Sequence, residues 1–137
     1  MTIVITLNAD GPREPGYVLE VAEGVAEGVR VLCHLTRDHE ALQYPSEADR
    51  LLRDISCAVS RLDQLLAQAG GWLDAERREG RITVTGGPYA GRPGSAVVAA
   101  KAALDEARKR LAQGVTALEI AASVTSCLAV REDGDGD

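Results

Sequence analysis

The stretch from residue 46 to residue 80 constrains the fold of this chain more than any other part of the sequence. In a heptad register its apolar residues fill three positions of every seven, so one broad apolar face follows a helix of about ten turns. Ser46 is typical of a helix N-cap, and Gly80 is typical of a left-handed helix stop. The pattern predicts a central helix wide enough to contact two neighbours. Gly70 and Gly71 predict a kink or a weak point near its end.

Two more heptad patterns predict helices over residues 17–43 and 96–130. Tyr44-Pro45 separates the first helix from the second, because the residue before a proline avoids the α conformation, and Ser95 is placed to cap the third. We expect the central helix to face its neighbours through three positions of each heptad: Ala48, Leu51, Leu52, Ile55, Ala58, Val59, Leu62, Leu65, Leu66, Ala69, Trp72 and Leu73.

The composition agrees with a helical core. Phe is absent and aromatic residues make up 3% of the chain, so the core must be built from Leu, Val, Ile and Ala. We therefore predict an all-α fold, an elongated antiparallel three-helix bundle, as a single domain over residues 1–130. Gly24 and Gly28 in the first helix predict either a close approach by another helix or a bend.

Two short β-branched segments predict a small β appendage to this bundle. Residues 2–7 (TIVITL) alternate in the manner of a strand, and residues 81–85 (RITVT) follow the same pattern. A two-stranded ribbon is marginal in isolation, so we expect it to lie on the helices or to pair across a dimer. Residues 131–137 predict an acidic, disordered tail.

The charge distribution argues against a nucleic-acid partner. The net charge is −6, and residues 1–130 still carry −3, so no broad basic field is present. No stretch approaches the about 20 apolar residues of a membrane span, and no signal peptide is evident. Three widely spaced cysteines (Cys33, Cys57 and Cys127) are typical of a reducing compartment, although one disulfide stays possible. These features predict a cytoplasmic protein, and the preference for Arg, Ala, Gly and Val indicates a GC-rich bacterial origin.

An arginine-rich region between the second and third helices is the candidate binding site. Its residues are able to hold a phosphate or an acidic partner, although nearby Glu76 and Glu79 also fit a mixed-charge surface without a ligand. The candidate residues are Arg77, Arg78, Arg81, Tyr89 and Arg92. The adjoining GGPYAGRPG sequence is glycine-rich but lacks the phosphate-loop pattern, so a structural loop is the preferred interpretation.

Two clusters on the first helix are weaker candidates for chemistry. His34 and Asp38 have the i, i+4 spacing of two metal ligands on one helix face. A second cluster (Glu20, Glu23 and Glu27) resembles the carboxylate clusters of all-α nucleotide pyrophosphohydrolases, which bind Mg²⁺. The acids of the next helix do not match the spacing of that family. A solvated surface is the preferred interpretation of both clusters, and no catalytic residue or cofactor is expected.

The run HLTRDHEALQYPSEADRLLRDI, followed by GPYAGRPG and an alanine-rich helix, resembles small all-α proteins of Streptomyces-type actinobacteria. The resemblance implies a bacterial cytoplasmic protein and assigns no site residue. We expect a non-enzymatic interaction or regulatory module that forms a helical homodimer and contacts a protein partner. The alternative is an all-α enzyme that binds a metal or a nucleotide through a carboxylate and histidine cluster.

Overall fold

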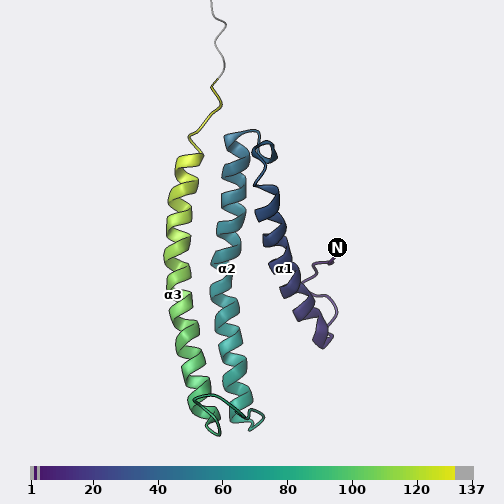
Figure 1. The fold of residues 1–137 in the computed structure, drawn as a ribbon, viewed down its shortest axis with the longest axis vertical. Coiled ribbons are helices and arrows are strands. Elements are labelled where there is room, and N and C mark those ends of the chain that lie inside the picture. The colour runs from purple at the N-terminus through teal and green to yellow at the C-terminus, as the bar shows by residue number, and fades with distance from the viewer. Residues whose placement is uncertain (1, 3, 132–137) are drawn as a thin grey trace, which may run out of the picture. The chain divides into compact units, whose positions relative to one another are not determined.

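The computed structural model describes residue 2 and residues 4–131 (Figure 1). These residues form three α-helices, namely α1 (Pro15–Leu35), α2 (Pro45–Arg78) and α3 (Pro93–Thr125), and a short 3-10 helix, η1 (His39–Ala41). The predicted all-α class is confirmed, and α2 packs against α3. The chain divides into two compact units, and the boundary lies between residues 43 and 44. The hairpin of α2 and α3 belongs to the second unit, and the single-domain three-helix bundle stays a prediction.

Helix α2 begins and ends with local chemistry that the sequence carries. Pro45 occupies the first helical position, where its missing N–H is not needed, and the Tyr44 backbone N–H donates to Glu47 Oε2 at 3.2 Å. The prediction that Ser46 caps the helix is therefore wrong, because Ser46 already lies inside it. At the other end the predicted stop is confirmed: Gly80 has φ +70°, and its N–H donates to the Arg77 carbonyl at 3.0 Å.

Helix α3 starts two residues before its predicted cap. Pro93 is again the first helical residue and Arg92 precedes it, so Ser95 lies inside the helix and does not cap it. The helix ends at Thr125 and not at residue 130. Helix α2 continues through Gly70 and Gly71 without a break, and Gly70 is buried where α3 comes close.

Polar pairs between α2 and α3 show that the two helices run antiparallel, as Figure 1 also shows. The Thr125 hydroxyl donates to Asp49 at 2.9 Å. Further along, Arg108 pairs with Asp63 at 2.9 Å, and Lys101 lies 3.7 Å from Asp74. Residue numbers rise along α2 as they fall along α3, so these polar pairs define the register of the hairpin.

The face of α2 that meets α3 matches the predicted one in part. Four residues of the predicted face are partly buried, as expected: Leu52, Val59, Leu66 and Leu73. The buried residues of α2 are Ser56 and Gly70, which were not in the predicted face, and they are small enough to let α3 approach closely. Two predicted seam residues, Leu65 and Trp72, are 55% and 62% exposed. On α3 the predicted position of Val97 is correct, since this side chain is buried. Heptad spacing alone does not decide which of two neighbouring stripes a partner helix will use, and here the stripe with small residues allows closer packing.

Helix α1 ends earlier than its heptad pattern predicts. The Thr36 hydroxyl donates to the Leu32 carbonyl at 2.8 Å, and the chain then turns. Asp38 accepts from the backbone N–H of Glu40 at 3.0 Å and so begins η1. Side-chain hydrogen bonds of this kind compete with a continuing helix, and His39 therefore lies outside α1.

The predicted β appendage is wrong for the described residues, because neither segment belongs to a strand. The described part of 2–7 is held against α1: the Tyr17 hydroxyl donates to the Thr6 carbonyl at 2.6 Å and accepts from the Asn8 N–H at 3.0 Å. The Ile5 side chain lies over Gly24, so the bare helix backbone there receives this segment and not another helix. In 81–85 the Val84 carbonyl accepts from Gly91 within its own loop at 2.9 Å.

Candidate functional site

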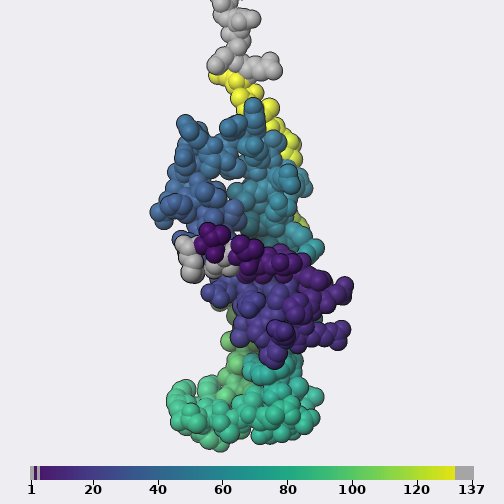
Figure 2. All heavy atoms as spheres, turned by 90° about the vertical axis from the view of Figure 1, so that its right-hand side faces the viewer, coloured from purple at the N-terminus to yellow at the C-terminus, as the bar shows by residue number. Residues whose placement is uncertain are grey.

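The predicted arginine site lies at the end of the hairpin where α2 and α3 connect, drawn in green in Figures 1 and 2. Two of its members belong to the last turn of α2, where both reach one carboxylate: Arg77 lies 3.0 Å and Arg78 2.7 Å from Asp74. Lys101 of α3 approaches the same carboxylate at 3.7 Å. The Asp74 side chain is only 15% exposed. The hydrogen bond from Arg77, together with the charges of Arg78 and Lys101, lowers the pKa of Asp74.

The third predicted arginine also has acidic partners, one in the last turns of α2 and one just after it. Arg81 donates twice to Glu76, and both distances are 2.7 Å, in a bidentate pair. This hydrogen bonding lowers the pKa of Glu76 and raises the pKa of Arg81. A second acid, Glu79, lies 3.7 Å from the Arg81 guanidinium. The two glutamates that the mixed-charge interpretation named are therefore the groups that neutralise Arg81.

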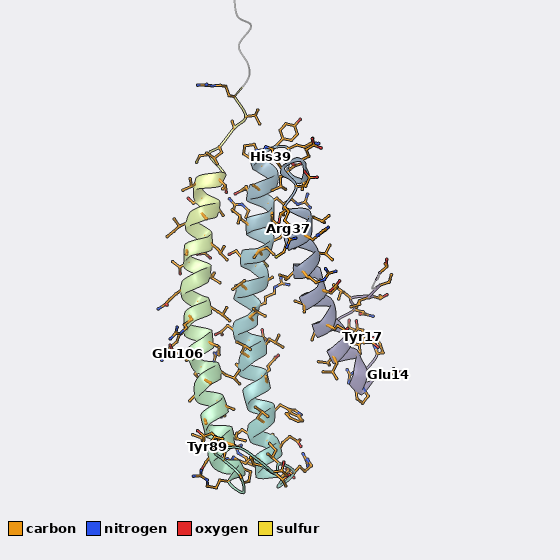
Figure 3. All side chains as sticks on the ribbon, in the orientation of Figure 1. Glu14, Tyr17, Arg37, His39, Tyr89 and Glu106 are labelled. Atoms are coloured by element: carbon orange, nitrogen blue, oxygen red, sulfur yellow. The ribbon has the colours of Figure 1, made fainter. Side chains whose placement is uncertain are left out.

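The last two predicted residues contact each other in the loop. The Arg92 guanidinium lies 5.7 Å from the centre of the Tyr89 ring, and it also donates to the Pro88 carbonyl. Gly87 and Gly91, with φ of +75° and +71°, provide the left-handed turns that fold the loop back on itself. Tyr89 is labelled at this connection in Figure 3.

The structure thus gathers the five predicted residues at one end of the hairpin, and each guanidinium has an acceptor from the same chain. These contacts close the end of the hairpin, where the α3 N-terminus and the α2 C-terminus meet. A role in binding a phosphate or an acidic partner stays a prediction. The acidic partners were visible in the sequence at helical spacing, so the neutralisation itself was predictable.

The weaker metal candidates do not form a set of ligands. His34 is in the last turn of α1, whereas Asp38 lies beyond the helix and caps η1. Glu27 is paired with Arg30 at 2.6 Å, a hydrogen bond that lowers the pKa of Glu27. Within residue 2 and residues 4–131, no group of three histidine, cysteine or acidic side chains is placed to hold an ion.

One side of the hairpin carries a shallow polar groove of about 530 Å³. Serine side chains line it, and two of them use their hydroxyls locally: Ser60 donates to the Cys57 carbonyl at 2.7 Å and Ser126 to the Ser123 carbonyl at 2.8 Å. Arg53, at the groove edge, is paired with Asp49 at 2.9 Å. These polar groups already have partners, so the groove has the character of a solvated surface.

The apolar groove lies in the other unit, between the N-terminal segment and α1, with a volume of about 710 Å³. Its walls are aliphatic, and Ile5 and Leu7 of the segment stand beside Val21 and Val25 of the helix. Among the described residues that line this groove, the charged one is Glu27, and it is paired with Arg30.

Comparison with known proteins adds no assignment: no family model, curated protein or solved structure matches this chain. The resemblance to actinobacterial proteins therefore stays a prediction. Among the described helices, none is both long enough and apolar enough to cross a bilayer.

Proposed function

We propose that this protein is a non-enzymatic interaction module of regulatory type that works as a helical homo-oligomer. One observation carries the proposal: the α2–α3 hairpin leaves large apolar side chains in solvent. Leu65 and Trp72 of α2 are 55% and 62% exposed, and Val124 of α3 is 60% exposed. In the described part of the chain the buried apolar residues are Val97 and Ala122 alone.

The energetic argument favours association. Full burial of a Val, Leu or Met-sized side chain is worth about 1.5–3 kcal/mol relative to full exposure, so each of these residues gains by meeting another surface. Contiguous apolar patches on soluble proteins commonly mark interaction sites. A hairpin of two long helices has only one internal seam, so it reaches a packed core most readily by adding further helices.

The charged groups support an interaction role over catalysis. The acids with lowered pKa in the second unit are Asp49, Asp63, Asp74 and Glu76, and each has an arginine partner. Paired carboxylates are held ionised and are poor candidates for general acids at neutral pH. The three-helix bundle expected from the sequence and a homo-oligomer are two ways to cover the same kind of apolar helix surface.

Sedimentation equilibrium on the full chain, over a wide range of concentrations, tests the proposal. We expect the mass to rise from the monomer value of 14.5 kDa towards an integral multiple of it. The association should persist in high salt, because apolar burial is not screened. A mass that stays at 14.5 kDa at every concentration contradicts self-association.

A further inference from the structure

The register of the hairpin assigns a side to every residue of α2 and α3. The contact seam is the line along which α2 and α3 meet, and it includes the buried residues Ser56 and Ala122. One polar groove is lined by residues that follow the seam by one position, such as Cys57 and Ser60 on α2 and Ser123 and Ser126 on α3. A helix advances by about 100° per residue, and in an antiparallel pair the same step moves both helices towards the same side. The residues one position before the seam therefore share the opposite side of the hairpin.

This opposite side is apolar on both helices, and we call it the free face. Its α2 stripe consists of eight residues of the apolar face predicted from the sequence: Ala48, Leu51, Ile55, Ala58, Leu62, Leu65, Ala69 and Trp72. Its α3 stripe consists mainly of small residues, with one arginine among them: Ala96, Ala100, Ala103, Ala107, Arg110, Gly114, Ala117, Ala121 and Val124. The free face thus joins a row of large side chains to a row of small ones.

The area of the free face fits a protein partner as long as the hairpin. With 34 and 33 residues, α2 and α3 are each about 50 Å long, and two helix diameters make about 20 Å of width. The face therefore offers about 1,000 Å² per copy, and a stable interface needs about 800 Å² per partner. Helix α1 has 21 residues and is about 32 Å long, too short to cover the whole face.

We propose that a second copy of this chain occupies the free face, with α2 of each copy packed on α3 of its partner. This inference rests on the proposed function and specifies its interface. Shape decides the arrangement: a two-fold axis parallel to the helices sets the large α2 stripe into the small α3 stripe of the partner. The other two-fold arrangement sets large residues on large and small on small.

The register then identifies the central contact. A two-fold axis parallel to the helices does not change the position of any residue along the helix direction. A residue of α2 therefore meets, on the partner's α3, the same residues that lie beside it on α3 of its own chain. Because Asp74 is level with Lys101, Trp72 is level with the nearby small residues Ala100 and Ala103. Trp72 therefore packs on Ala103 of the partner subunit. A large aromatic residue seated on small ones is the usual form of an interface anchor.

Trp72 is the single tryptophan of the chain, so its fluorescence reports on this face directly. We expect the emission of the full chain to shift to shorter wavelength as the mass rises with concentration, because the indole leaves water. Mass that rises while the emission stays constant overturns the proposed face and leaves self-association standing. A chain that stays monomeric contradicts both proposals. Blue-shifted emission in that monomer indicates that α1 of the same chain covers Trp72.

Substitutions test the contact and its arrangement. Trp72→Ala is expected to raise the dimer Kd by roughly tenfold to a hundredfold, the range of an interface anchor. Val98→Ala is the matched control. Val98 is an apolar residue of α3 that is 67% exposed, and it lies on the polar side of the hairpin, one position after the seam residue Val97. Ala103→Trp should weaken the dimer through overpacking, and the double variant Trp72→Ala/Ala103→Trp should recover much of the affinity.

Each result has one meaning. Equal weakening by Trp72→Ala and Val98→Ala overturns the free face as the interface. A double variant that is no better than Ala103→Trp alone overturns the packing of α2 on the partner's α3. Circular dichroism at the same concentrations shows that every variant is folded. Should Trp72→Ala fail to fold, Ala103→Trp compared with Ala102→Trp, on the polar side of α3, provides the same comparison.

Discussion

Replacing Gly70 with alanine should stabilise the hairpin. A Cβ atom at this position would lie 3.5 Å from Leu104 Cδ1 and 3.7 Å from Lys101 Cγ, which are ordinary contact distances. A glycine inside a helix costs about 0.5–1 kcal/mol relative to alanine, and one buried methyl group adds about 0.8 kcal/mol at most. Gly70→Ala is therefore expected to raise the free energy of unfolding by about 1–2 kcal/mol.

Gly71 provides the matched control for this prediction. Nothing lies within 4 Å of a Cβ atom built at Gly71, so Gly71→Ala gains the backbone term without the contact. Its expected effect is about 0.5–1 kcal/mol. Each kcal/mol corresponds to about 4–8 °C in Tm for a unit of this size. Urea titrations followed by circular dichroism measure both variants at one fixed protein concentration, because association also adds to apparent stability.

Opposite effects of the two substitutions would refute the reasoning in a specific way. If Gly70→Ala destabilises while Gly71→Ala stabilises, α2 and α3 approach more closely than the Leu104 distance indicates. If both variants destabilise the chain, the two glycines are needed for a bend in α2, although α2 is one continuous helix here. Either result removes the argument that Gly70 is a packing position with room for a methyl group.

Gly80→Ala should destabilise the chain by about 1 kcal/mol, because an alanine there is forced to a positive φ. Thermal melting of Gly80→Ala and of the control Gly71→Ala shows whether the loss is specific to the helix stop. Asp74→Asn should lower stability at neutral pH and flatten the acid side of a plot of Tm against pH. The folded-state pKa of Asp74 is lowered, first by the hydrogen bond from Arg77, so its contribution is present above the unfolded value of about 4 and is lost as the pH falls through the folded value. An unchanged acid limb in Asp74→Asn would show that the pair adds nothing to folding.

Periodicity and end signals predicted much of the hairpin. The α2 helix was located to within two residues at each end, and the Gly80 stop was correct, because both depend on local chemistry. The caps at Ser46 and Ser95 were wrong for a shared reason: a proline one or two residues before each serine already occupies the first helical position.

The orientation of α2 towards α3 could not be predicted from the same pattern. Two adjacent stripes of α2 are apolar enough to pack, and the choice between them depends on how small residues such as Ser56 and Gly70 match α3. The end of α1 was missed because the Thr36 and Asp38 side chains compete with the helix for backbone groups. The arginine cluster was located correctly, but its pairing with Asp74 and Glu76 depends on side-chain geometry that spacing only suggests.

The polar pairs along the hairpin have a consequence for its alignment. Fourteen residues, 79–92, connect α2 to α3, and a connection of that length leaves several alignments open to the helices. Sliding α3 by one heptad would set Asp49 against Leu118, and sliding it the other way would set Asp63 against Val115. Each slip takes a carboxylate away from its partner and sets it beside an aliphatic side chain, so the polar pairs favour the observed alignment over the others that the connection permits. The connection is thereby free to lengthen or shorten while the two helices keep their alignment.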